Sequence, residues 1–410
     1  MDLKKTKIVF IIRHPYAKRD HVRFGAKYLM DRGYQVEIWR IMSADSLQME
    51  WTAGMYSGSN YHEYTEEMYA DALDRDRDCS LFIFQGKIEA LYPAAGKGCR
   101  YIILAGLGVL PVMHTDDEDL LYHAPGANLL SKLANRLERL TPDHLRKRIL
   151  QKSLNRKRST LLSENPPLFF VTSTQYAAKR YLTGEERSGR VLYTHSMDYD
   201  RYIEANRKDA NTHEKHIVFI DSGYFHKNYD FYREKKDSRQ DAGEHFFGQL
   251  NALFASLEAH YGLPVVIAGH PHSVYEDEFG ARELVFDQTC ELVKDAALVI
   301  MSTSTAVSFA ILYDKPVLKI YNQFMRQMPG AYGLSLYGYI ALETATNLGC
   351  GILDMDDVEK MTHPWDFALR PDAVKREKYL RDCIIDNDTS GHTIMECVEE
   401  RIRSDLAGEQ

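Results

Sequence analysis

The chain has 410 residues, of which 44% are hydrophobic and 27% charged, and its formal net charge is −8. These values exclude a disordered chain, and the acidic balance argues against a nucleic-acid partner bound across the surface. No apolar run approaches the length of a membrane span, and the six cysteines lack zinc-ligand or disulfide spacing. We expect a cytoplasmic protein with two or three domains of ordinary size.

The first half alternates short apolar runs with helical segments. Residues 7–12 (KIVFII) predict a strand, 18–32 an amphipathic helix ending at Gly33, and 34–41 a second strand. This strand–helix–strand order is a βαβ unit. Later strands of the same sheet are predicted at 81–85, 100–108, 168–173 and 190–196.

The second half restarts this pattern. Strands are predicted at 216–222, 264–269, 284–287, 297–302 and 316–321, with a long helix at 241–261. Their continuous Val/Ile/Leu runs are typical of parallel strands buried on both faces. We therefore expect an α/β protein of two Rossmann-like domains, 1–205 and 206–410, with parallel sheets facing a central cleft. A single larger doubly wound domain is the alternative.

The segment 144–158 (HLRKRILQKSLNRKR) predicts a basic helix. It is either a solvated helix or a docking surface for an anionic membrane or acceptor. Peripheral contact with the inner membrane is therefore an expectation for this segment.

Two turns in the second half carry polar side chains after predicted strands. Gly269, His270, Pro271 and His272 follow the strand 264–269, and an imidazole there can donate to a phosphate oxygen. A second turn follows the strand 297–302 and is rich in hydroxyls: Ser302, Thr303, Ser304 and Thr305. The alternative to phosphate binding is that this turn only caps the helix that follows, for which one hydroxyl suffices. If the two strands are neighbours, both turns face one crevice and hold a phosphate.

A third polar turn begins at Asp221, where the strand 216–222 ends. A carboxylate there can act as nucleophile or general base, and His226 and Asp230 follow in the same loop. The alternative is an aspartate that forms the turn before Ser-Gly. Asp221 and His270 are the candidate catalytic residues.

Charged residues in the first half suggest a second, weaker site. Lys18, Arg19 and Arg23 follow the first strand and are suited to an acidic sugar, a phosphate or an acceptor. A charged first helical turn is the alternative. Asp198 and Asp200 have DxD spacing, but acidic pairs are common in turns, so no metal site is predicted. The chain also lacks a Walker lysine and a GxGxxG after a strand, which disfavours ATPases and dehydrogenases.

Several of these stretches resemble one family. RHPYAKRDHVRFGAKYLMDRGYQVEIW, HSMDYDRYI and IDSGYFHKNYD are similar to shared blocks of bacterial surface-carbohydrate glycosyltransferases. AGHPHS and MSTSTA resemble the His-Pro and Ser/Thr motifs of transferases that use CMP-activated acidic sugars. The chain thus resembles the retaining β-Kdo transferases of O-antigen and capsule assembly. One departure is Ser222, where that family usually has Gln, which leaves the sugar open between Kdo and another ulosonic acid.

The resemblance implies a GT-B fold, a CMP-Kdo-like donor held by the second domain, and a glycan or lipid-linked glycan acceptor. It implies no metal or other cofactor. His270, Ser302, Thr303 and Ser304 would hold the CMP phosphate, and Asp221 would form a glycosyl intermediate. A UDP-sugar transferase or UDP-GlcNAc 2-epimerase-like enzyme, and a non-catalytic glycan-assembly subunit, remain the alternatives.

Overall fold

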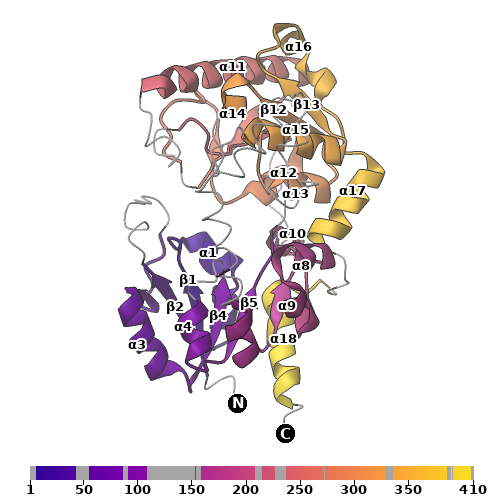
Figure 1. Ribbon diagram of the computed structural model, residues 1–410. Helices are drawn as coiled ribbons and strands as arrows, with labels where there is room; N and C mark the ends of the chain where they lie inside the picture. Colours follow the sequence, from indigo (N-terminus) through magenta and orange to yellow (C-terminus); the bar gives the residue numbers. More distant parts are fainter. Residues whose placement is uncertain are drawn as a thin grey trace. The chain divides into compact units, whose positions relative to one another are not determined.

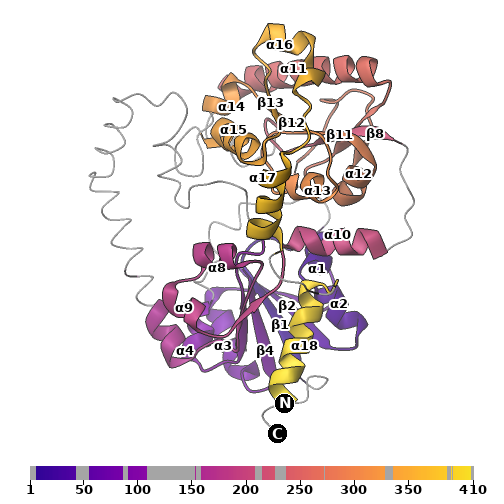
Figure 2. The same ribbon diagram turned by 90° about the vertical axis from the view of Figure 1, so that its right-hand side faces the viewer.

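The computed structural model of the chain describes residues 6–42, 55–85, 91–108, 153, 158–207, 215–226, 237–271, 273–327, 336–385, 389 and 391–407. These residues form two compact units (Figures 1 and 2). Unit 1 contains the described residues up to 107, those from 153 to 200 and those from 385 onward. Unit 2 contains residue 108 and the described residues from 201 to 384.

Unit 1 is built on a seven-stranded sheet in the order β3-β2-β1-β4-β5-β6-β7, with every neighbouring pair parallel. Its central strands are runs of Ile, Val, Phe and Leu that are buried on both faces, as parallel strands require. The strands are β1 (Lys7–Ile12), β2 (Gln35–Ile41), β3 (Tyr61–Tyr64), β4 (Ser80–Gln85), β5 (Tyr101–Leu104), β6 (Phe170–Thr172) and β7 (Val191–Tyr193).

Helices cover both faces of this sheet. The described helices of unit 1 are α1 (Lys18–Arg23), α2 (Ala26–Asp31), α3 (Glu66–Asp76), α4 (Leu91–Gly96), α8 (Gln175–Tyr181), α9 (Gly184–Ser188) and α18 (Ile394–Ala407), and α10 (Met197–Arg207) crosses the boundary to unit 2. One core cluster joins the sheet to α2 and α18, and the other joins it to α3, α4 and α8.

The C-terminal helix α18 belongs to a different unit from the one predicted for it. All of 206–410 was predicted to form the second domain, whereas the described residues from 385 belong to unit 1. The reason is the apolar face of α18, because Ile394, Met395, Val398 and Ile402 are buried in the unit 1 core. Figure 2 shows α18 lying beside α2.

The helix predicted over 18–32 is two helices, broken between Arg23 and Ala26. Gly25 stands at the break with φ +76°, in the left-handed region that favours glycine. A Cβ placed on Gly25 would lie 2.6 Å from Cβ of Met395 on α18. Gly25 thus provides both the bend and the close approach of α18.

Unit 2 repeats the architecture with a six-stranded parallel sheet in the order β10-β9-β8-β11-β12-β13. Its strands are β8 (His216–Ile220), β9 (Val265–Ala268), β10 (Leu284–Val285), β11 (Ala296–Met301), β12 (Val317–Tyr321) and β13 (Gly351–Asp354). Its helices are α11 (Asp237–Tyr261), α12 (Thr289–Asp295), α13 (Val307–Leu312), α14 (Gln323–Gln327), α15 (Leu336–Leu348), α16 (Val358–Thr362), η4 (Pro364–Phe367), α17 (Ala373–Tyr379) and the π-helical turn η5 (Leu380–Ile384). The long helix α11 covers one face, where its buried Phe and Leu side chains join the core.

Two doubly wound parallel sheets confirm the predicted fold class of two Rossmann-like units. The cleft predicted between them stays a prediction. Each predicted strand overlaps an observed one, whereas β3 and β13 were missed because they are short and contain polar residues. No helix within the described ranges is long and apolar enough to cross a membrane.

The basic segment 144–158 lies outside the described residues except for positions 153 and 158. Arg158 forms a buried ion pair with Glu186, with Nη2 donating to Oε2 at 2.8 Å. Arg158 therefore does not belong to a solvated basic face, and the membrane contact predicted for the other basic residues stays a prediction.

Candidate functional site

The carboxyl edge of the unit 2 sheet brings three of the predicted turns together. Strand order reverses at β8, so β9 lies on one side of it and β11 on the other. The turns after β8, β9 and β11 carry Asp221, His270 and Ser302 at their starts or near them. In open α/β sheets a ligand binds at this kind of switch point. The strands before His270 and Ser302 were predicted to be neighbours, and this is wrong because β8 separates them.

Asp221 occupies the centre of this edge and is buried, with 5% of its surface exposed. Its Oδ1 accepts a hydrogen bond from the backbone N–H of Gly223 at 3.0 Å. Its Oδ2 faces Nε2 of His226 at 2.9 Å and accepts a short hydrogen bond from the hydroxyl of Tyr275. Both carboxylate oxygens are therefore occupied by groups of the protein itself.

The partner imidazole of His226 is fully buried between two carboxylates. Its Nδ1 lies 3.3 Å from Oε1 of Glu278, and its ring packs against Phe247 and Tyr275. Burial alone lowers the pKa of His226, but the hydrogen bond and charge of Asp221, with Glu278, raise it above its ordinary value. Burial raises the pKa of Asp221, but the bonds from His226, Tyr275 and Gly223 lower it overall.

These contacts bear on the prediction that Asp221 is the nucleophile, which stays a prediction. A nucleophilic carboxylate needs an open oxygen that faces the substrate. In this structure the Asp221 carboxylate is turned into the protein and braces the turn from 221 to 226. A glycosyl intermediate on Asp221 and a retaining mechanism stay predictions, and the carboxylate would have to leave these contacts to form that intermediate.

The hydroxyl turn after β11 separates into an inner and an outer pair. The inner hydroxyls tie the β11 turn to the β8 turn: Ser302 donates to Ser222 at 3.0 Å, and Thr303 pairs with Tyr224. Ser222 in turn donates to the carbonyl of Thr303 at 2.6 Å. Both side chains are buried and bonded within the fold, and the phosphate-binding roles predicted for Ser302 and Thr303 stay predictions.

The outer pair, Ser304 and Thr305, lies nearer to solvent. Ser304 is half-buried and accepts a hydrogen bond from the backbone N–H of Ala306 at 3.2 Å, as an N-cap-like turn does. Thr305 is exposed. Of the four predicted hydroxyls, these two can reach a ligand.

His270 is held close to the β8 turn. Gly223 has φ +78°, and a Cβ there would lie 2.9 Å from Nδ1 of His270. The backbone N–H of His270 donates to the hydroxyl of Tyr275, which itself donates to Asp221. Ser273 lies 3.4 Å from Nδ1 of the same ring. The half-buried His270 ring is thus positioned by the buried network and remains partly open to solvent.

Other predicted residues fall around or outside this edge. Pro271 is half-buried, whereas His272 and Asp230 lie outside the described residues. At Gly269 a Cβ would lie 2.7 Å from the ring of Phe286, so glycine permits the close packing of that ring. His226, predicted to meet sugar or acceptor, is instead fully buried.

The unit 1 candidates lie beside β1. Lys18 is exposed, and Arg19 lies 3.6 Å from Asp20 through its Nε. Arg23 forms an ion pair with Asp198, with Nη2 to Oδ1 at 3.5 Å. All three lie on helix α1, where Lys18 is exposed and Arg19 and Arg23 are half-buried.

The second carboxylate of the DxD spacing has a structural role. Asp200 accepts from the backbone N–H of Ile394 at 2.8 Å, and its Oδ1 lies 2.5 Å from Nε2 of the buried His195. These contacts fasten the start of α18. Among the described residues no group of three or more His, Cys, Asp or Glu side chains forms a metal site.

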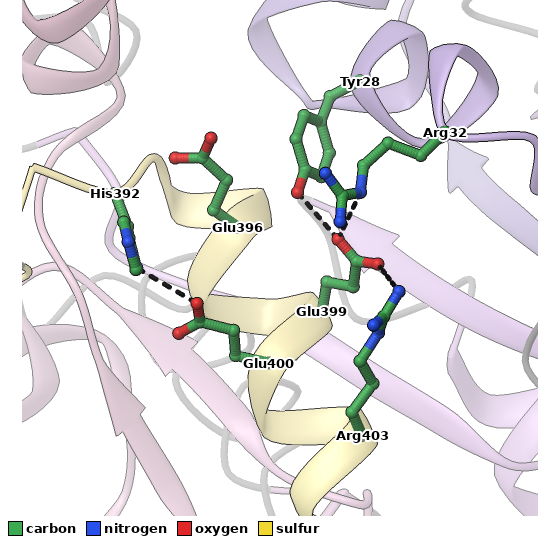
Figure 3. A pocket seen from close by; sticks show the side chains of 7 residues that line it. All are labelled: Tyr28, Arg32, His392, Glu396, Glu399, Glu400 and Arg403. Atoms are coloured by element: carbon green, nitrogen blue, oxygen red, sulfur yellow. Dashed lines mark hydrogen bonds and ion pairs between the residues drawn. The ribbon is translucent and has the colours of Figure 1, made fainter.

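A separate surface pocket lies where α2 meets α18 in unit 1 (Figure 3). Glu399 is central to it, because Tyr28 donates to this carboxylate at 2.7 Å and Arg32 and Arg403 pair with it at 2.9 and 2.6 Å. The negative charge of Glu399 is thus balanced by Arg32 and Arg403. The pocket marks the attachment of α18, and none of the predicted site residues lines it.

Sequence reasoning missed two members of the Asp221 network, Tyr275 and Glu278. Both follow His270 within eight positions in a loop between β9 and β10. A tyrosine in that loop gives no signal by itself, because only the fold brings its hydroxyl to the carboxylate.

Solved structures resemble the chain at low sequence identity. No family model and no curated protein matches the chain. Solved structures similar to it include the wall teichoic acid polymerase TagF, with 12% identity, 98% of this chain and 90% of that chain covered, and a TM-score of 0.47. The calicheamicin glycosyltransferase CalG4 has 11% identity, covers 98% of each chain and has a TM-score of 0.44. The UDP-N-acetylglucosamine 2-epimerase from Rickettsia bellii has 12% identity, coverage of 92% and 96%, and a TM-score of 0.45. Likenesses at this level do not bear on activity.

Proposed function

We propose that the chain is a glycosyltransferase that binds a nucleotide-activated sugar at the carboxyl edge of unit 2. The observation that carries this proposal is that the turns with His270, Ser304 and Thr305 follow β9 and β11, the two neighbours of β8 at the switch point of the sheet. An imidazole and two hydroxyls can hydrogen-bond a phosphate oxygen as it takes up charge. The buried Asp221 network supports this role, because it fixes the position of the His270 backbone.

The donor we propose is a CMP-activated acidic sugar, Kdo or a related ulosonic acid. This choice rests on the resemblance of the AGHPHS and MSTSTA stretches to transferases with such donors. In the transfer, the bond between the anomeric carbon and the phosphate oxygen breaks and CMP leaves. The anomeric carbon bonds to the acceptor oxygen, and the proton of the acceptor hydroxyl passes to solvent. His270 and the hydroxyls stabilise the departing phosphate without a metal in this scheme. The proposed acceptor is a bacterial surface glycan, free or lipid-linked.

The proposal is tested by calorimetry on the full chain with CMP and with UDP. We expect CMP to bind, and His270→Ala to weaken its affinity about tenfold or more, as the loss of a hydrogen bond to a charged group does. His260→Ala is the matched control, because His260 is an exposed histidine at the end of α11, just before the amino end of β9. It should leave the affinity for CMP unchanged.

Three results separate the alternatives. Binding of UDP in place of CMP would reassign the donor to the UDP-sugar class. Binding of neither nucleotide would remove the proposed activity and favour a non-catalytic subunit. Equal losses in His270→Ala and His260→Ala would remove His270 from the donor site.

A further inference from the structure

Unit 1 has an uncommon concentration of guanidinium groups around one histidine at the end of β1. His14 follows β1 by two residues, and its ring stands edge-on to Phe24 at the end of α1, with 5.9 Å between ring centroids. Arg40 is in register beside this point, since β2 pairs Arg40 with Ile12 of β1. Helix α1 contributes Arg19 and Arg23 from the same side. Neither His14 nor Arg40 was singled out by sequence reasoning.

Side-chain alternation places these groups on one face of the sheet. Ile8, Phe10 and Ile12 of β1 point to the core shared with α2 and α18, and His14, beyond the end of the strand, contacts Phe24 of the same core. On β2 the same alternation takes Val36 and Ile38 to that core and carries Arg40 toward it as well. His14 and Arg40 therefore lie beside α1.

Arg40 has an unused donor. Its side chain is 10% exposed, and its Nη1 pairs with Glu63 at 2.7 Å. Among the described residues its buried Nε has no hydrogen-bond partner. An unsatisfied donor on a buried cation is costly to the fold, so such a group points to a ligand that satisfies it.

Each arginine near His14 also has a carboxylate partner, which is Asp20 for Arg19, Asp198 for Arg23 and Glu63 for Arg40. Burial lowers the pKa of His14 first; Asp20 opposes this, and Arg19, Arg40 and Arg23 lower it further. Burial and the three cations favour the neutral imidazole, and the unpartnered Nε of Arg40 is the donor that remains for an anion. Asp20 is itself engaged, because it accepts from the backbone N–H of Ala17 at 2.9 Å.

We propose that His14, Arg19, Arg23 and Arg40 form an oxyanion-binding site for the acidic group of a sugar ligand. This deepens the proposed function, and it rests on that function only for the identity of the natural ligand. A carboxylate of an ulosonic acid and a phosphate of a lipid-linked acceptor share the required chemistry. Binding of either replaces part of the repulsion on the imidazolium form of His14 by attraction, so it raises the pKa of His14.

The test is a histidine-selective NMR titration of the full chain, with the His14 signal assigned by its loss in His14→Gln. Inorganic phosphate and acetate are the two probes, and sodium chloride at equal ionic strength is the reference. We expect phosphate or acetate to raise the pKa of His14 by about one unit, a tenfold change in its protonation equilibrium. Response to both probes assigns a carboxylate-compatible site, and response to phosphate alone assigns a phosphorylated ligand.

Variants show which cations act. Arg23→Gln, a partly exposed position, should weaken the probe's effect on His14 about tenfold or more, and Arg40→Lys should weaken it while keeping the charge. Arg75→Gln is the matched control, because Arg75 is an exposed arginine on α3, which packs on the other face of the sheet. It should leave the effect unchanged.

The inference is overturned if neither probe moves the pKa of His14 more than chloride does, or if Arg23→Gln and Arg75→Gln behave alike. This result is distinguishable from failure of the proposed function. CMP binding that depends on His270 would persist if only the unit 1 site is wrong. A response of His14 without any nucleotide binding would leave the site standing and remove the nucleotide donor.

Discussion

At the scale of single residues, Asp221 shows how an acidic side chain at the end of a strand can be engaged by hydrogen bonds within the fold. Asp221 stands where a catalytic carboxylate was expected, at the end of β8 and beside His270. The difference between a nucleophile and a brace is decided by its neighbours. Here His226, Tyr275 and Gly223 hydrogen-bond the carboxylate of Asp221. The hydroxyl of Tyr275 also accepts a hydrogen bond from the backbone N–H of His270.

Replacing Asp221 by Asn should therefore cost stability. In the wild type, the His226 N–H and the Tyr275 hydroxyl donate to a carboxylate. The Asn side chain faces them with either an N–H donor or an uncharged carbonyl oxygen. We expect a loss of about 3–5 kcal/mol in the free energy of unfolding, as when one partner of a buried ion pair is removed. Urea unfolding of the wild type and Asp221→Asn measures this loss.

The pH dependence of this loss follows from the two pKa shifts. The lowered pKa of Asp221 gives stability that is present above about pH 4 and is lost as pH falls through the folded-state pKa. The raised pKa of His226 gives stability that is present below about pH 6.5 and is lost as pH rises through its folded-state pKa. The difference between wild type and variant should be largest between these limits.

Asp277→Asn, a change at an exposed position of the loop after β9, is the control and should leave stability nearly unchanged. A stable Asp221→Asn protein that has lost only its transferase activity would show that Asp221 takes part in the chemistry after all.

At the scale of elements, the break between α1 and α2 determines how α18 reaches the core. The helical pattern over 18–32 continues through Phe24 and Gly25, so a single helix is a reasonable prediction from periodicity. The left-handed backbone of Gly25 and the nearness of Met395 explain the break. The contact joins residues about 370 positions apart in the sequence, which local pattern does not reveal.

Gly25→Ala should weaken the packing of α18 for two reasons. A left-handed backbone costs a non-glycine residue about 1–2 kcal/mol, and the new methyl group overlaps Met395. Gly98→Ala is a control for the first reason alone, since Gly98 has φ +69° and no neighbouring atom lies within 4 Å of the place that a Cβ would occupy. Gly25→Ala should lose more stability than Gly98→Ala in chemical unfolding, and equal losses would contradict the role given to Met395.

At the scale of the whole molecule, the chain runs through unit 1, then unit 2, and returns to unit 1 with α18. The stability of unit 1 therefore depends on residues at the far end of the sequence. Val398 is 1% exposed in the unit 1 core, on the inner face of α18.

Val398→Asp should open unit 1 and leave unit 2 folded. A buried unpaired carboxylate costs several kcal/mol. Hydrogen exchange should become faster in β1 and β2 and stay slow in β8 and β11. Glu400→Ala changes an exposed position of the same helix and should alter neither sheet. Faster exchange in both sheets would mean that the two units do not unfold independently.

The sequence by itself determined the α/β class and the positions of most strands. Runs such as KIVFII and ALVIM are apolar on both faces, and this is a local property that a parallel sheet needs. It also located the turns at the carboxyl edge, because polar residues directly follow those runs. The edge that holds His270, Ser304 and Thr305 was predictable for this reason.

Only the tertiary structure decided which polar side chains remain open to a ligand. Burial and hydrogen bonding depend on what lies across the sheet edge, so only the structure shows that Asp221, Ser302 and Thr303 are buried and bonded within the fold. The sequence also did not reveal that α18 packs in unit 1, because an amphipathic pattern does not determine which core the apolar face of a helix joins.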